Sequence, residues 1–341
     1  MQAVIYTPCK SLDDPDAFTL IEQATPTPSG HDLLISIDAV SVNPVDTKIR
    51  MAASSDDVPK VLGWDAVGRV EAVGDAVELF KPGDRVFYAG DISRPGSNAS
   101  HQLVDERIVG RCPASLSAEQ AAAMPLTSIT AWEALFHRLK IQPGEAGKRI
   151  LIIGAAGGVG SIAIQLAKVI AKLEVIATAS RDETVQWCQS MGADHVINHH
   201  QDLAEQLKEG GIAAPDYIFC LNDTDYYFPV MAELIAPQGM ICGIVGGNKS
   251  HDLNGLKSKS AGFVWEFMFT RSMFQTQDMV RQHELLNQVA GLLDSGQIKS
   301  TLNAQPSQIP GKMGVETIRQ SHRILESGRS IGKIVLSGFD Q

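Results

Sequence analysis

The sequence predicts an α/β fold in which a doubly wound parallel sheet accompanies a second, mostly-β domain. From residue 149 onward, short apolar runs alternate with amphipathic helical segments, which is typical of a parallel sheet covered by helices on both faces. Before residue 123, short strand patterns are separated by Gly, Pro and Asp, which indicates a small barrel or sandwich. The length of 341 residues fits about two domains of roughly 150 residues each.

The elements of the mostly-β part follow from the alternation of polar and apolar residues. Near Ser117 this pattern changes, because a Ser cap followed by Ala-rich sequence predicts the start of a helix. The predicted strands cover residues 33–37, 69–72 and 85–88, with turns at Asn43-Pro44 and at residues 81–84.

The parallel-sheet part begins with an apolar strand at residues 150–153. Apolar side chains at helical spacing from Val159 to Ile170 predict the helix that follows it. The same alternation continues with predicted strands at residues 175–178, 195–197, 217–221 and 240–245 and predicted helices at residues 182–190, 202–208 and 226–235.

The last part of the chain contains too few elements for a core of its own. After residue 275, the pattern predicts helices at residues 279–293 and 315–325 and a strand at residues 333–336. Roughly 65 residues with one strand make a poor independent core. We therefore expect one domain of residues 1–126 and 276–341, interrupted by a parallel-sheet domain of residues 127–275.

Composition excludes several classes of protein. A formal net charge of −10 argues against a protein that coats nucleic acid. The five cysteines lie far apart, without the spacing of a zinc site, and no leader pattern is visible, so a reduced, cytoplasmic protein is expected. The uncharged residues 150–167 have the length of a membrane span, but four glycines interrupt them. We expect no membrane and no nucleic acid partner.

A glycine motif directly follows the first strand of the parallel sheet. Ala155, Gly157 and Gly160 fit the dinucleotide fingerprint, and Gly158 and Val159 complete the turn into the helix. Gly157 would let the backbone approach a pyrophosphate, and Gly160 would let the helix pack closely on the strand. The alternative is a tight strand-to-helix turn with no ligand.

The end of the second strand suggests which dinucleotide binds. An NAD site usually has a carboxylate there, but this strand ends at Ser180 and Arg181. A guanidinium and a hydroxyl suit a 2′-phosphate, so we expect NADPH rather than NADH. The alternative is that Arg181 is a solvated residue at the start of a helix.

Several motifs in one order resemble the medium-chain dehydrogenases/reductases, on their quinone oxidoreductase side and most closely the zinc-type alcohol dehydrogenase-like proteins. The resemblance covers nearly the whole chain. It implies a GroES-like catalytic domain built from both chain ends, an inserted Rossmann NADP-binding domain and an active site in the cleft between them. The motifs are AVSVNPVDT (39–47), GWDAVGRV (63–70), FKPGDRV (80–86), SNASHQLVDER (97–107), AAGGVG (155–160) and MGAD (191–194).

The same resemblance argues against zinc. In the zinc members, a Cys and the His of a Gly-His-Glu motif bind the catalytic metal, and a lobe with four Cys binds a structural one. The corresponding positions here are Asn43 and Trp64, and the Cys lobe is missing. Trp cannot ligate zinc, which needs about three protein ligands of N, S or O type. We predict that the protein holds no metal.

Three residues are candidates for catalysis without a metal. Asn43 is followed by Pro44, which restricts its backbone and so directs its amide toward a substrate oxygen; alternatively, it is a turn residue. Lys48 could polarise a carbonyl or donate a proton if burial lowered its pKa, but it could equally be a surface lysine. Asp46 could orient Lys48 or cap the local turn.

The resemblance also suggests further contacts with cofactor and substrate. Thr130 would lie beside the nicotinamide and His199 beside the adenine ribose; the alternatives are an ordinary helix hydroxyl and a loop histidine with no ligand. Independently of the resemblance, Lys333 on the last predicted strand could reach the cofactor phosphates. Trp64 and Trp265 are candidates for the wall of the substrate pocket.

Aromatic residues alternate in one segment of a chain that has few of them. Phe263, Trp265, Phe267 and Phe269 would share one face of a strand. This pattern suggests an edge strand that pairs across a homodimer and lines the substrate cleft, or else a buried aromatic face within one subunit.

The predicted function is hydride transfer from NADPH to a small quinone or α,β-unsaturated carbonyl. Reduction of simple carbonyls, as in an alcohol dehydrogenase, is the nearest alternative within the enzyme class. A non-catalytic protein that binds or senses NADPH is the alternative from another class.

Overall fold

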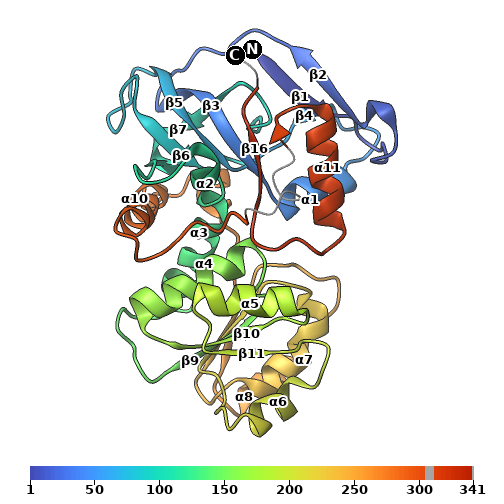
Figure 1. Cartoon of the computed structure of the whole chain (residues 1–341), viewed down its shortest axis with the longest axis vertical. Helices are drawn as coiled ribbons and strands as arrows, with labels where there is room; N and C mark the ends of the chain where they lie inside the picture. The colour runs from blue at the N-terminus through green and yellow to red at the C-terminus, as the bar shows by residue number, and fades with distance from the viewer. Residues whose placement is uncertain (304–310, 340–341) are drawn as a thin grey trace. The chain divides into compact units, whose positions relative to one another are not determined.

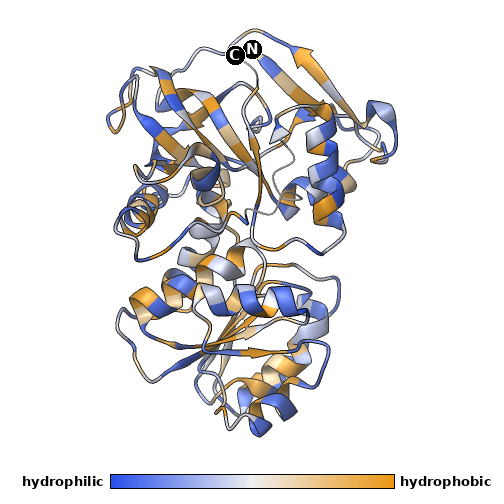
Figure 2. Cartoon of the chain, viewed as in Figure 1, coloured by the Kyte–Doolittle hydropathy of each residue, from blue (hydrophilic) through white to orange (hydrophobic). Residues whose placement is uncertain are grey.

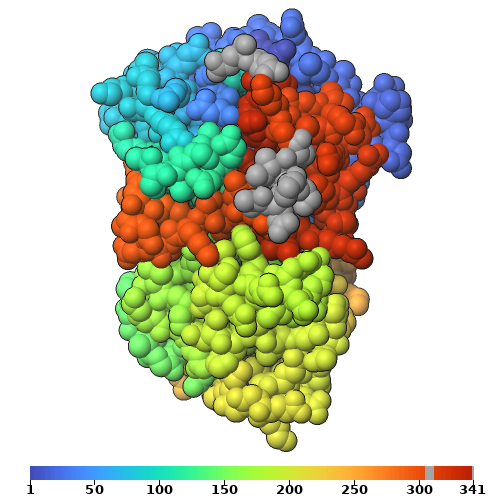
Figure 3. Space-filling view, in the orientation of Figure 1, coloured from blue at the N-terminus to red at the C-terminus, as the bar shows by residue number. Residues whose placement is uncertain are grey.

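The computed structural model describes residues 1–303 and 311–339. It divides into two compact units. The split unit consists of Met1–Ile129 and Phe269–Gln341, and the inserted unit consists of Thr130–Met268. Figure 3 shows the two segments of the split unit in contact, since blue-to-green and orange-to-red residues make up one body.

A six-stranded, fully parallel sheet forms the inserted unit (Figure 1). The strands are β9 (Arg149–Ile153), β10 (Glu174–Thr178), β11 (His195–Ile197), β12 (Tyr217–Cys220), β13 (Met240–Gly243) and β14 (Gly262–Trp265). Their order in the sheet is β11-β10-β9-β12-β13-β14. Successive strands are added on one side of β9 up to β11 and on the other side from β12 onward, so the strand order reverses between β9 and β12. This is the Rossmann order, and it confirms the predicted doubly wound sheet.

Helices connect these strands, and the strands themselves are apolar. Ile150 to Ile153 of β9 are all buried, and Figure 2 shows the strands of this sheet as largely hydrophobic. Parallel strands buried on both faces require such continuous apolar runs. The connecting helices are α4 (Gly158–Leu166), α5 (Asp182–Met191), α6 (Leu203–Glu209) and α7 (Thr224–Leu234).

The split unit is built around the long strand β3 (Asp32–Val42). β5 (Ala66–Val73), β7 (His101–Asp105) and β16 (Ile334–Ser337) all pair with β3, and the sheet continues through β6 (Arg85–Tyr88), β8 (Val109–Arg111) and β15 (Gly311–Lys312). A smaller sheet contains β1 (Gln2–Tyr6), β2 (Phe18–Glu22) and β4 (Lys60–Val61).

The end of the chain returns to the split unit, as the poor core of the tail predicted. β16 lies antiparallel to β3, with Ile334 opposite Val42. The helix α10 (Arg281–Asp294) packs on β8, and α11 (Val315–Glu326) packs on α1 (Pro44–Ala52). Two further helices, α2 (Ala118–Ala122) and α3 (Pro125–Trp132), precede the inserted sheet.

The uncharged run at residues 150–167 is interrupted as its glycines predicted. It contains β9, a turn and α4. Among the residues that the structure describes, no helix is both long enough and apolar enough to cross a membrane.

The prediction that four alternating aromatic residues share one strand face is wrong. β14 ends at Trp265, so only Phe263 and Trp265 share a face, with ring centroids 4.8 Å apart. Phe269 is buried instead, with its ring edge against Trp64. The chain leaves the strand after Trp265. The residue that follows, Glu266, is buried, and its Oε2 accepts a hydrogen bond from Arg138 at 2.7 Å.

A buried histidine is expected to make the stability of the protein depend on pH. His322 on α11 is fully buried against Phe18, and burial lowers the pKa of its imidazole to about 3. Because an unfolded histidine titrates near 6.5, the unfolded chain binds the extra proton between these values, so stability falls as the pH drops below about 6.5. This group alone should remove about 2 kcal/mol between pH 7 and pH 5.

We therefore expect His322→Leu to weaken the dependence of stability on pH in this range. Urea unfolding of both proteins at pH 7 and pH 5 measures the difference, and the exposed His200→Leu serves as the control. Burial also raises the pKa of Asp46 to about 7, so Asp46 adds its own pH dependence in this range. Because Asp46 is present in both proteins, the difference between wild type and His322→Leu reports His322. Equal pH dependence in wild type and His322→Leu would contradict the assignment.

Candidate active site

The glycine turn lies at the carboxyl end of β9, where the strand order reverses. Gly154 has a φ of +82°, and its N–H donates to Thr178 Oγ1 at 3.0 Å, which joins the ends of β9 and β10. Gly157 precedes the first turn of α4, and its lack of a side chain means that no side chain caps the helix. The first backbone N–H groups of α4 are thus free of a side-chain cap, as an anion site at a helix N-terminus requires.

The residues of this turn fit a dinucleotide. A Cβ on Gly160 would lie 2.3 Å from the Ala155 carbonyl oxygen, so only glycine allows this close helix-to-strand approach. A Cβ on Gly157 would meet no atom closer than 3.7 Å. Gly157 therefore leaves open space, which a phosphate group can approach. Crevices at such a reversal are the usual ligand sites of doubly wound sheets.

Three predicted cofactor residues lie at the ends of β10 and β11, next to this turn. Ser180 and Arg181 follow β10 and are partly exposed, and Arg181 forms an ion pair with Glu183 at 3.0 Å. Partial burial lowers the pKa of His199, and the nearby charges of His200 and Arg181 lower it further. That these three residues bind one cofactor stays a prediction.

A second group of polar residues lies in the split unit around Asn43. Its backbone N–H donates to Asp46 Oδ2 at 2.6 Å, so Asp46 caps the start of α1. Its side-chain amide donates to the carbonyl of Ser41 at 3.2 Å and to Asp65 Oδ2 at 3.1 Å. Both amide N–H groups are therefore used within the protein, and Asn43 has none left for a substrate oxygen.

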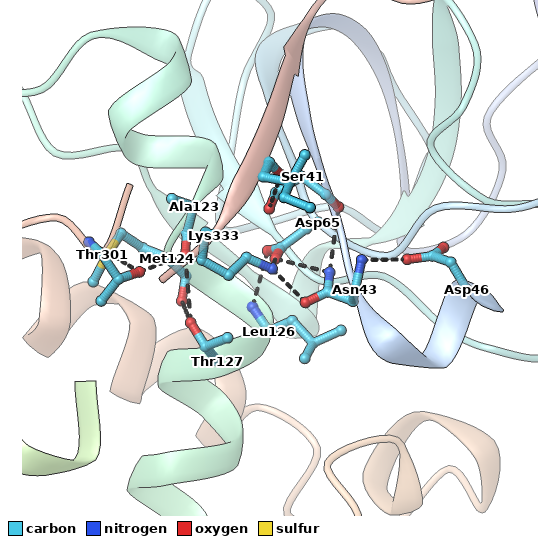
Figure 4. A network of polar contacts seen from close by, with 11 residues as sticks. Ser41, Asn43, Asp46, Asp65, Ala123, Met124, Leu126, Thr127, Thr301 and Lys333 are labelled. Atoms are coloured by element: carbon cyan, nitrogen blue, oxygen red, sulfur yellow. Dashed lines mark hydrogen bonds and ion pairs between the residues drawn. The ribbon is translucent and has the colours of Figure 1, made fainter. Parts of the chain in front are cut away.

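Lys333 joins this group from the first residue before β16 (Figure 4). Its Nζ donates to Asn43 Oδ1 and, at 3.0 Å, to Asp65 Oδ2. The other oxygen of Asp65 accepts the backbone N–H of Leu126 at 2.9 Å, at the start of α3. Lys333 and Asp65 are 4% and 0% exposed, so they form a buried ion pair in which both oxygens of Asp65 accept hydrogen bonds.

Burial controls the ionisation of both carboxyl groups in the cluster. It raises the pKa of Asp46 to about 7, although the N–H of Asn43 and the charge of Lys333 act in the other direction. Burial also raises the pKa of Asp65, against the lowering effect of Lys333. Two buried carboxyl groups thus lie near one buried ammonium.

The structure changes the roles expected for several predicted residues. Lys48 is exposed on α1 and is therefore not a buried, activated lysine. Asp46 caps a helix, as one of its two readings proposed. Lys333 contacts Asn43 and Asp65, whereas its contact with cofactor phosphates stays a prediction.

The structure also locates the predicted residues Trp64, Thr130 and Trp265. Trp64 is buried, and its Nε1–H donates to the carbonyl of Asp91 at 3.1 Å. Thr130 is buried in α3, and Trp265 is 48% exposed on β14. Their contacts with cofactor or substrate stay predictions.

Sequence reasoning missed Asp65. This residue joins Lys333, Asn43 and Leu126, yet it follows directly after Trp64 in a motif quoted only for its resemblance. A lone carboxylate between Leu62 and Val67, in an otherwise apolar segment, was the available indication, because a buried charge needs a partner.

Comparison with known proteins identifies the family. The alcohol dehydrogenase GroES-like domain matches residues 29–132, and the zinc-binding dehydrogenase domain matches residues 158–286. A zinc-type alcohol dehydrogenase-like protein of Staphylococcus aureus (strain MSSA476) is 48% identical over 96% of both chains. The chain belongs to the medium-chain dehydrogenase/reductase superfamily. It is an oxidoreductase of the zinc-type alcohol dehydrogenase-like group, with a GroES-like split unit, as its motifs predicted.

Solved structures of this superfamily share the fold over the whole chain. One is the crystal structure of a protein from Rhizobium etli CFN 42 that is described as a zinc-dependent alcohol dehydrogenase. It is 47% identical in sequence and has a TM-score of 0.93, and the match covers 100% of this chain and 99% of that one. The quinone oxidoreductase of Escherichia coli, solved with NADPH, is 26% identical and has a TM-score of 0.83 over 99% and 100%.

The zinc in the family name does not fit the residues of this chain. Asn43 Oδ1 already accepts from an ammonium, and the Trp64 ring nitrogen is a donor that is bonded to Asp91. Within residues 1–303 and 311–339, no three His, Cys, Asp or Glu side chains come together as a metal site. That the protein holds no zinc stays a prediction, for which metal analysis of untagged protein is the test.

Proposed function

We propose that the protein is an NADPH-dependent, zinc-free reductase of quinones or α,β-unsaturated carbonyls. The observation that carries this proposal is that Lys333 and Asp65 bond to Asn43, one of the two positions that correspond to zinc ligands in the resembled family. These side chains offer hydrogen bonds and charge, but no set of zinc ligands. Conjugated acceptors suit such a site, because the negative charge that develops spreads onto an oxygen that hydrogen bonds can stabilise.

The inserted unit supplies the groups for the cofactor. Backbone N–H groups at Gly158, Val159 and Gly160 would hold the pyrophosphate, and Ser180 and Arg181 would bind the 2′-phosphate. When bound, NADPH supplies the hydride, and the product takes its second hydrogen as a proton from water. Thr130 and His199 would position the nicotinamide and the adenine ribose.

Oxidation of NADPH with a panel of quinones, enones and simple aldehydes tests the proposal. We expect turnover with the first two groups and little with aldehydes. Preference for aldehydes would favour a carbonyl reductase. Tight binding of NADPH without oxidation across the panel would favour a protein that only binds or senses the cofactor.

Cofactor preference should depend on Arg181. Its guanidinium is partly exposed, so we expect Arg181→Ala to weaken NADPH binding about 10- to 100-fold, the effect of one charge-assisted hydrogen bond. Binding of NADH should change little, since NADH has no 2′-phosphate. Titration of both dinucleotides against wild type and variant measures the difference, and an equal loss for both would contradict the role of Arg181.

We also propose a homodimer that pairs through β14. β14 is an edge strand, and Trp265 and the nearby Phe267 are 48% and 45% exposed.

We further propose that the protein works in a reducing compartment such as the cytoplasm. All five cysteines are unpaired, which supports a reducing environment.

Lysine at both aromatic positions should separate the subunits. We expect the double variant Trp265→Lys/Phe267→Lys to sediment as a monomer while keeping the thermal midpoint of its inserted unit. In the proposed dimer these aromatic side chains would be buried at the core of the interface, where charged residues are depleted. Lysine at both positions would therefore remove the favourable burial. Lysine at the exposed Leu253 is the control, and a monomeric wild type at micromolar concentration would contradict the dimer.

A further inference from the structure

A positive charge is buried in the split unit beside Asn43, which corresponds to a zinc-ligand position in the resembled family. Lys333 is only 4% exposed, and its Nζ contacts Asp65 Oδ2 and Asn43 Oδ1. A buried charge is strongly unfavourable unless it is paired and hydrogen-bonded. The side chains of Asp65 and Asn43 meet both conditions, so the cluster is arranged around a cation.

Among Lys333, Asn43 and Asp65, Lys333 is the side chain with a donor N–H left. An ammonium has three N–H groups, and two of them have acceptors here. Both amide N–H groups of Asn43 are used, and ionised Asp65 can only accept. Within the part of the chain that the structure describes, the third N–H of Lys333 has no protein acceptor.

We infer that the ammonium of Lys333 is the resident cation of this centre and takes the place that the metal has in zinc members of the superfamily. Asn43 Oδ1 and Asp65 Oδ2 serve as its ligands. A divalent ion could not share these oxygens, since two cations at hydrogen-bond distance repel strongly in a buried site. The presence of Lys333 thus gives a physical reason for the predicted absence of zinc.

The consequence for catalysis rests on the proposed function. A fixed ammonium with one open N–H can stabilise negative charge on a substrate oxygen, and it costs no reorganisation during the reaction. Unlike a metal, it offers no empty orbital for an alkoxide ligand, which favours acceptors whose charge is delocalised.

The test is replacement of the missing cation by a small amine. Lys333→Ala leaves a cavity beside the carboxylate of Asp65, into which ethylammonium fits as a substitute for the deleted side chain. We expect ethylammonium to raise the thermal midpoint of Lys333→Ala saturably, by roughly 2–4 °C, through preferential binding to the folded protein. Tetramethylammonium, which has no N–H, should have no such effect.

Wild type and Lys168→Ala are the matched controls. Lys168 also pairs with a carboxylate, Asp194 at 2.8 Å, but both side chains are about one-third exposed, so water replaces the lost ammonium. Neither protein should respond to ethylammonium. An equal response in Lys168→Ala and Lys333→Ala, or none in Lys333→Ala, would overturn the inference, as would one tightly held zinc per wild-type chain.

A second pair of variants covers the case in which Lys333→Ala does not fold. Lys333→Met should lower the thermal midpoint, and Lys333→Met/Asp65→Leu should recover part of the loss, because the second change removes the uncompensated carboxylate. If Lys333→Met were as stable as wild type, the site would need no cation, and the inference would be wrong.

These readouts are independent of enzymatic activity. If wild type oxidised no NADPH with any acceptor but ethylammonium still stabilised Lys333→Ala, the proposed function would fail and the resident cation would stand. If wild type is active, ethylammonium should also restore turnover of Lys333→Ala. Active wild type together with a variant that ethylammonium neither stabilises nor rescues would leave the function intact and overturn the cation.

Discussion

Replacement of Gly160 by alanine is expected to disrupt the glycine turn and abolish NADPH binding. The added Cβ would lie 2.3 Å from the carbonyl oxygen and 2.5 Å from the Cα of Ala155, both backbone atoms that have no rotamer through which to move away. Overpacking of this kind costs about 1–3 kcal/mol or more. The inserted unit should therefore lose stability, and α4 should move away from the end of β9.

Gly157→Ala separates folding from binding. Its Cβ would meet no atom closer than 3.7 Å, and its φ of −75° suits any residue, so the fold should be unchanged. A methyl group at this point of the turn would, however, hinder close approach of the pyrophosphate, and we expect NADPH to bind at least ~10-fold more weakly. Thermal midpoints and NADPH titrations of both variants are the measurements, and wild-type affinity in Gly160→Ala would refute the assignment.

Asp65→Asn is expected to be one of the most damaging conservative changes in the split unit. Both oxygens of Asp65 face donors: Leu126 on one side, Asn43 and Lys333 on the other. An asparagine must point its NH₂ group at donors whichever way it turns, and it removes the carboxylate that is bonded to the buried ammonium. Breaking a buried pair in this way typically costs 3–5 kcal/mol, and we expect a loss of about that size.

Urea unfolding of Asp65→Asn against wild type measures this loss. Glu284→Gln is the control, because Glu284 pairs with Arg281 at 2.8 Å while both side chains are largely exposed. Such surface pairs contribute about 1 kcal/mol or less. Similar losses in the two variants would show that the burial of Asp65 has no energetic consequence.

The sequence carried enough information to predict the architecture of the inserted unit. Continuous apolar strands and the glycines at positions 154–160 are local patterns, and each has one common structural solution. The return of the last strand could also be predicted, because residues 276–341 lack the apolar area for a separate core. These arguments need no knowledge of which side chains meet across the fold.

The polar centre could be predicted only in part, because its contacts join residues far apart in the chain. Asn43 was found from its local sequence, and its amide was expected to face a substrate oxygen. The structure shows that the amide is used by the nearby Ser41 and, across the fold, by Asp65. Lys48 was a candidate because it lies where many quinone reductases carry a Tyr on the pocket wall, where an ammonium could polarise a carbonyl or donate a proton. The burial that distinguishes Lys333 from Lys48 depends on the pairing of β16 with β3.

The pairing of β16 with β3 also determines when the centre can form during synthesis. Asn43 and Asp65 leave the ribosome early, but their ammonium partner follows 290 and 268 residues later, after the whole inserted unit has been made. The inserted unit can thus fold on the nascent chain, while the carboxylate of Asp65 must remain hydrated until Lys333 emerges. A premature stop before residue 333 would consequently yield a chain in which the parallel sheet of the inserted unit can fold but Asn43 and Asp65 lack their ammonium partner.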